Sequence, residues 1–95
     1  MIEYYVLVNK TRKEKIYLKE NRRFSGGEYG LLKLDACGLD EATKYQSYQK
    51  ALSTVVLMQV LNSKFRKLCD DNQIAIAKVK VDVQLMELKE YSKNI

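Results

Sequence analysis

The sequence predicts an α+β domain in which an antiparallel sheet of about four strands packs against one long central helix. Three observations support this fold. The chain begins with a stretch rich in Tyr, Val and Leu, its middle repeats apolar residues at helical spacing, and a Val-rich alternating stretch follows near the end. Ninety-five residues make one domain, 1–95, with a basic N-terminal hairpin and sheet over 1–38, the helix over about 40–71 and a C-terminal strand over 74–86.

The helix is the element around which the rest is organised. Residues 47–71 contain no Gly or Pro, and polar Asn62 is the one interruption of an apolar repeat at spacings of three and four. Its start has two solutions: Asp40 caps a helix that runs unbroken to Asp71, or residues 44–46 are extended and Ser47 is the cap. The spacing of apolar residues before Ser47 favours the longer helix. The repeat itself comprises Ala51, Val55, Met58, Phe65 and Cys69.

The strands are predicted from alternation and from turn residues. Residues 2–8 and 15–19 form two strands, and their short separation predicts an antiparallel hairpin. Gly26-Gly27 indicates a turn that leads into a third strand over about 28–34. In the last strand Ile74 and Ile76 lie on the opposite parity from the later valines, which predicts either a bulge near Ala77-Lys78 or a change of covered face.

Positive charge is concentrated near the N-terminus. The chain has 17 Lys and Arg residues against 12 acidic residues, a net charge of +5. A loop of the N-terminal part is expected to present this charge to an anionic partner, since Arg and Lys bind phosphate and carboxylate groups. The ordinary alternative is a solvated edge that blocks aggregation. The candidate anion-binding residues are Lys10, Arg12, Lys13, Lys15, Arg22 and Arg23.

Aromatic residues interleave with these cations. Tyr5, Tyr17 and Tyr29 lie on the predicted strands and are candidates for stacking on a base. The ordinary alternative is that they are residues at the edge of the core. The chain lacks the Lys/Arg-Gly-Phe-Gly-Phe pattern of a standard single-stranded RNA module.

The segment 55–61 is apolar on nearly all sides, although a helix lying on a sheet needs only one covered stripe. A second copy of the chain is the simplest cover for the outer side, so a homodimer is expected. The alternative is that the chain's own strands and tail wrap the helix. The candidate interface residues are Val56, Leu57, Val60 and Leu61.

Several function classes are disfavoured. The chain has no histidine and no spaced nucleophile–base pair, so we expect neither an enzyme, a metal site nor a cofactor. Cys37 and Cys69 form no CxxC pair and are expected to be reduced thiols. No run approaches the roughly 18 apolar residues that cross a membrane. The N-terminus lacks a secretory signal pattern, so we expect a cytoplasmic protein without a membrane partner.

The order of elements resembles small ββαβ-type accessory proteins of phages and mobile elements. The resemblance is carried by residues 4–11 (YYVLVNKT), residues 15–18 (KIYL), Ala42, Tyr45, Ser47 and Ala51 at their spacing, and the closing Val-rich strand. Gly26-Gly27 and the long helix depart from the simplest version. The resemblance implies a non-catalytic protein that inhibits host defence by binding a host protein surface or a nucleotide signal. The alternative function is a basic regulator that binds nucleic acid.

Overall fold

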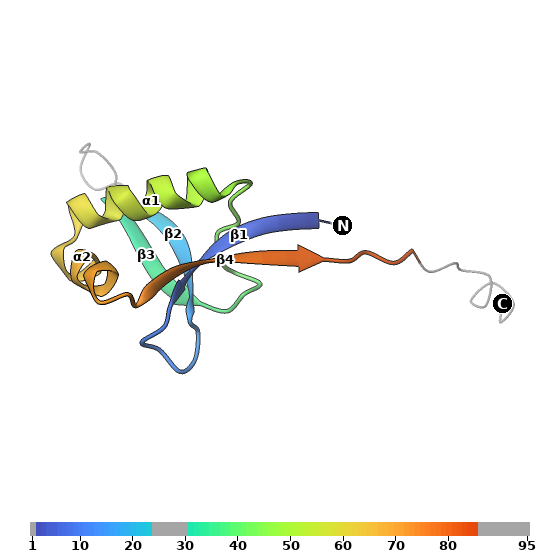
Figure 1. The fold of residues 1–95 in the computed structure, drawn as a ribbon, viewed down its shortest axis with the longest axis horizontal. Helices are drawn as coiled ribbons and strands as arrows, with labels where there is room; N and C mark the ends of the chain where they lie inside the picture. The colour runs from blue at the N-terminus through green and yellow to red at the C-terminus, as the bar shows by residue number, and fades with distance from the viewer. Residues whose placement is uncertain (1, 24–30, 86–95) are drawn as a thin grey trace, which may run out of the picture.

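A computed structural model describes residues 2–23 and 31–85. Four strands form one antiparallel sheet in the order β3-β2-β1-β4, which confirms the predicted sheet. Two helices follow β3 in the chain and lie on one side of the sheet (Figure 1). The elements are β1 (Ile2–Asn9), β2 (Tyr17–Arg23), β3 (Leu31–Cys37), α1 (Tyr48–Leu61), α2 (Ser63–Asp70) and β4 (Ile74–Val81).

The prediction of one long helix over about 40–71 is wrong, because the chain forms two shorter helices. Ser47 begins α1 with an extended backbone, and its Oγ accepts a hydrogen bond from the N–H of Lys50. Asn62 is also extended (φ −141°, ψ 112°) and separates the helices. Its Oδ1 accepts from the N–H groups of Lys64 and Phe65, so the break caps α2. The alternative start at Ser47 is therefore correct.

The strands differ from their predicted bounds mainly at their ends. β2 begins at Tyr17 rather than at residue 15 and runs on to Arg23, while β3 begins at Leu31. The predicted antiparallel hairpin of β1 and β2 is present, with Val8 opposite Tyr17. The Gly26-Gly27 turn and the end of the predicted last strand at residue 86 lie outside the described residues.

β4 pairs with β1 without a bulge, from Ile2 opposite Val81 to Asn9 opposite Ile74. The change of apolar parity along this strand therefore reflects a change of covered face. Ile74 and Ile76 pack in the cluster beneath the helices, whereas Ala75, Ala77 and Val79 pack on the opposite face. β4 ends at Val81, opposite Ile2, and residues 82–85 form no strand, so the predicted strand over 74–86 is too long.

The core occupies both faces of the sheet. Val6 and Leu7, neighbours on β1, are both fully buried and point to opposite faces. On the helix face Leu7 and Leu18 pack against α1 and α2. On the other face residues 38–42, which follow β3, supply Leu39 and Ala42 as cover. The helix-side cluster comprises Leu7, Leu18, Tyr45, Ala51, Val55, Met58 and Phe65.

Candidate functional site

The loop between β1 and β2 carries the densest group of cations. Lys10, Arg12, Lys13 and Lys15 are all exposed. Within residues 2–23 and 31–85, the ion pair that forms joins Lys78 and Glu3, whose charged atoms are 3.2 Å apart. None of the four loop cations is therefore neutralised by an ion pair in this part of the chain.

Hydrogen bonds hold both ends of this loop. The N–H of Asn9 donates to the carbonyl oxygen of Ile16 (2.7 Å), and the N–H of Lys10 donates to that of Gln73 (2.7 Å). Asn9 Oδ1 accepts from both the N–H and the Oγ1 of Thr11 (3.1 and 2.6 Å), which is the turn chemistry that Asn provides. The four cations thus extend from an anchored backbone.

The structure does not bring Arg22 and Arg23 to this loop. Both belong to the end of β2 that is remote from the loop, since β2 begins beside the loop at Tyr17. At ~3.3 Å per strand residue, Arg22 lies about 17 Å along β2 from Tyr17. Arg22 and Arg23 therefore lie apart from the loop, and the structure brings together Lys10, Arg12, Lys13 and Lys15.

The candidate stacking residues do not form one platform either. Tyr5 packs in the helix-side cluster, with its ring edge-on to Tyr48 at a centroid distance of 6.3 Å. Tyr17 packs on the opposite face of the sheet. Tyr29 lies outside the described residues. A cation–π contact that was not predicted joins Lys44 to Tyr4, with Nζ 5.2 Å from the ring centroid.

The outer side of α1 is the second candidate surface. The four predicted interface residues are exposed, and Val60 most of all, at 80%. The inner side of α1 is buried through Ala51, Val55 and Met58. A shallow groove of about 420 Å³ follows the outer side, lined by Gln49, Leu52, Ser53, Val56, Leu57 and Val60. Self-association through this face stays a prediction.

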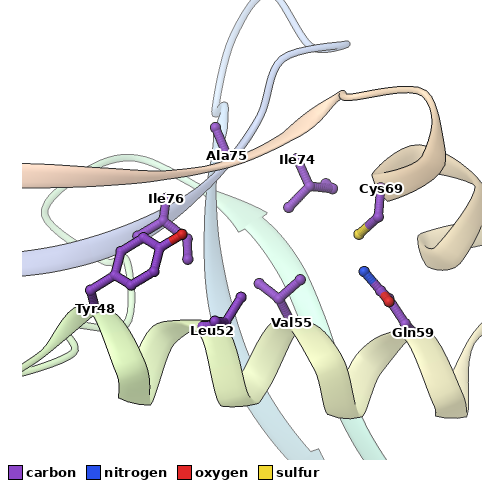
Figure 2. Close-up of a pocket in the computed structure, with 8 residues that line it drawn as sticks. All are labelled: Tyr48, Leu52, Val55, Gln59, Cys69, Ile74, Ala75 and Ile76. Carbon is purple, nitrogen blue, oxygen red and sulfur yellow. The ribbon is translucent and has the colours of Figure 1, made fainter.

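A cleft of about 330 Å³ lies between α1, the end of α2 and β4 (Figure 2). Its walls are mainly aliphatic, and Figure 2 shows the Gln59 amide and the Cys69 sulfur pointing toward each other across it. One sign of this cleft is visible in the sequence, because Cys69 shares the apolar spacing of the core residues. The lining residues are Tyr48, Leu52, Val55, Gln59, Cys69, Ile74, Ala75 and Ile76.

The two cysteines lie on opposite faces of the sheet, Cys69 beside the helix-side cluster and Cys37 in the other cluster. Neither Cys37 nor Cys69 forms a disulfide. Burial raises the pKa of Cys37, with a smaller contribution from the charge of Glu41, so its thiol stays protonated and is a poor nucleophile. Across the described ranges there is no group of three or more His, Cys, Asp or Glu side chains that could hold a metal ion. No described helix is long and apolar enough to cross a membrane.

Comparison with known proteins adds no relative. No family model, curated protein or solved structure matches this chain. Any functional inference therefore depends on the surfaces described above.

Proposed function

We propose that this chain is a small non-catalytic binding protein that contacts an acidic patch on a protein partner through the loop between β1 and β2. The observation that supports the proposal is the exposure of Lys10, Arg12, Lys13 and Lys15 on one anchored loop without an ion pair to any described residue. Unpaired cations on one loop attract an anionic surface. Because hydrogen bonds hold the backbone at both ends of the loop, binding has mainly side-chain freedom to restrict.

The shape of this cluster favours a compact acidic patch over a nucleic acid. A duplex binder spreads its cations along the phosphate backbone, and a single-strand binder adds aromatic rings for stacking. Here Arg22 and Arg23 are at the far end of β2, and Tyr5 and Tyr17 lie on opposite faces of the sheet. Neither arrangement extends the loop into a groove for nucleic acid.

The test replaces the four loop cations with Gln and measures binding to poly-glutamate and to a duplex DNA by fluorescence anisotropy. The matched control replaces four exposed lysines elsewhere with Gln, so that net charge falls equally: Lys33 on β3, Lys50 on α1, and Lys64 and Lys67 on α2. We expect the loop variant to lose about tenfold or more in affinity for poly-glutamate while the control stays close to the original protein. Circular dichroism checks that both variants are folded.

Two results would contradict the proposal. Equal losses in the loop variant and in the control would mean that net charge, and not the loop, drives binding. Tighter binding to duplex DNA than to poly-glutamate, with a log–log salt slope of about −0.9 per contacted phosphate, would favour the nucleic-acid alternative.

A further inference from the structure

The outer edge of β4 is a sheet edge to which no described strand is hydrogen-bonded. β4 ends the strand order, so within the described residues only β1 pairs with it. Edge strands of this kind are templates for a further strand unless Pro, a bulge, a cover or charged side chains block them. β4 carries Lys78 and Lys80, so only a strand with complementary charge suits this edge. β4 has no bulge, and the chain has no Pro. Figure 1 shows the chain continuing past the N-terminal end of β1 and away from the sheet after β4.

The backbone direction of each β4 residue follows from the contacts of β1. Tyr5 directs both its N–H and its carbonyl oxygen to Tyr45, on the side of β1 away from β4. Its neighbour Tyr4 therefore faces β4, where it lies opposite Val79. Since alternate residues point to opposite sides of a strand, Lys78 and Lys80 direct their backbone N–H and C=O groups to the free edge. Asp82 and Gln84 have the same parity.

We infer that the segment 77–85, which comprises the end of β4 and the four residues after it, pairs in antiparallel fashion with the same segment of a second copy of this chain, about a two-fold axis at Val81. In this register Lys80 lies opposite Asp82 of the second copy, and Lys78 lies opposite Gln84. Lys78 and Lys80 direct their backbone groups to the free edge, and Asp82 and Gln84 do so once the strand continues past Val81, so both are hydrogen-bonded pairs in the dimer. Val81 meets its own copy at the close, non-hydrogen-bonded position.

Charge selects this register over its neighbours. Other antiparallel registers can pair the same backbone N–H and C=O groups. In each of them the two-fold axis lies one or more whole residues away from Val81. An axis at Lys80 places Lys80 opposite Lys80, and an axis at Asp82 places Asp82 opposite Asp82. The axis at Lys80 and the axis at Val81 each form two Lys–Asp pairs, Lys78–Asp82 and Lys80–Asp82 respectively. Only the axis at Val81 does so without a pair of like charges directly opposite each other, which would destabilise the sheet.

The apolar residues of the segment 77–85 match in this register as well. Val83 is 65% exposed and Leu85 is 95% exposed in the single chain. With the axis at Val81, Val83 lies opposite Val79 of the second copy and Leu85 lies opposite Ala77. The pairing therefore covers a row of side chains that the domain's own core leaves in solvent, which is the expected pattern for a symmetric interface.

The dimer would place the two basic loops at opposite ends of a continuous sheet. Each loop follows Asn9, which lies opposite Ile74, at the end of β4 remote from Val81. At ~3.3 Å per residue, Ile74 is about 23 Å from the axis, so the loops are about 45 Å or more apart. They would contact two separate acidic patches rather than enclose one small ligand.

A charge exchange tests the interface in the intact chain. Lys80 and Asp82 are both exposed. Lys80 also lies opposite Glu3 of β1, so Lys80→Asp places two acids opposite each other within the chain, and circular dichroism checks that each variant is folded. Each single variant places like charges opposite each other and should weaken dimerisation about tenfold or more, whereas the double variant restores opposite charges and dimerisation. Light scattering and sedimentation equilibrium measure the mass against the 11.1 kDa of one chain. Lys50→Asp on the exposed side of α1 is the control for charge alone.

Each result decides for or against this interface. A chain that stays monomeric at high micromolar concentration would overturn the proposal. Single variants that dimerise normally, or a double variant that fails to recover, would rule out the axis at Val81. Val60→Asp tests the outer side of α1. If Val60→Asp splits the dimer and Lys80→Asp does not, the interface lies on the helix. These measurements use no anionic probe, so they are independent of the proposed loop function.

Discussion

Tyr5 and Tyr45 exchange both of their backbone hydrogen bonds, each N–H donating to the other's carbonyl oxygen at 2.8 Å. This pairing lies on the side of β1 where β2 would be expected. β1 and β2 are in register at Val8 and Tyr17, and Figure 1 shows the β1–β4 pair crossing the β2–β3 pair at a steep angle. Residues 43–45 therefore satisfy backbone groups that the divergence of β1 and β2 would otherwise leave unpaired.

Thr43 joins this segment to β2 and gives the first prediction. Its N–H donates to the carbonyl oxygen of Leu18 (3.2 Å), and its Oγ1 accepts from the part-buried N–H of Glu20 (2.7 Å). Thr43→Ala leaves that N–H without its acceptor, so we expect the free energy of unfolding to fall by about 1–2 kcal/mol. Urea denaturation measures this change. Thr43→Ser keeps the oxygen and should retain most of the stability; equal losses in both variants would assign the effect to the Thr methyl group.

The second prediction concerns the alkaline limit of stability. Burial raises the pKa of Tyr45 to about 12, from an ordinary value near 10, and the charge of Glu20 adds to the increase. Below pH 10 the hydroxyl is protonated in both the folded and the unfolded chain. Between pH 10 and 12 the unfolded chain releases this proton first, so the free energy of unfolding falls, by about 2–3 kcal/mol in total.

Tyr45→Phe isolates this contribution. The Tyr45 hydroxyl is buried beside Thr54 and Glu20, which bond to each other (3.2 Å), and it has no well-formed hydrogen bond to the described residues. Its removal should therefore leave stability at pH 7 unchanged or slightly higher. Urea denaturation between pH 9 and 12 should then show a smaller loss of stability in the variant than in the original protein. Parallel curves for the two proteins would mean that other tyrosines dominate the alkaline transition.

The elements that were predicted correctly are those with a local cause. Alternation along β1 and β4 and the apolar repeat of α1 depend on side-chain periodicity, which is visible in one segment at a time. The extended conformation of residues 43–45 has a remote cause, because Tyr5 and Leu18 supply the bonding partners. Without them, helical spacing before Ser47 extended the predicted helix too far. Asn62 was visible as an interruption, but not as a cap that starts a new helix.

In the candidate site, too, features with a local cause could be predicted and features with a remote cause could not. The four loop cations are close in sequence, so their proximity could be predicted. Arg22 and Arg23 are only a few residues further along, but β2 carries them to its far end. Tyr5 and Tyr17 face opposite sides of the sheet because of the register between β1 and β2, which composition does not reveal.

The last prediction uses two adjacent valines on α1 to measure whether its outer side is covered in solution. Val55 is 8% exposed and packs against the sheet, whereas Val56 is 53% exposed in the single chain. Val55→Ala should lower the free energy of unfolding by about 2 kcal/mol through lost burial and a cavity. Val56→Ala should change it by less than about 0.5 kcal/mol, as for other surface positions.

Protein concentration makes this comparison informative about self-association. If β4 forms the interface between copies, the small effect of Val56→Ala should be the same at low and high protein concentration, because Val56 stays in solvent in both states. Thermal unfolding at several concentrations measures this dependence, with Val55→Ala as the buried reference. A loss of stability from Val56→Ala that grows with concentration would show that a second copy covers the outer side of α1, and would favour the helix over β4 as the interface.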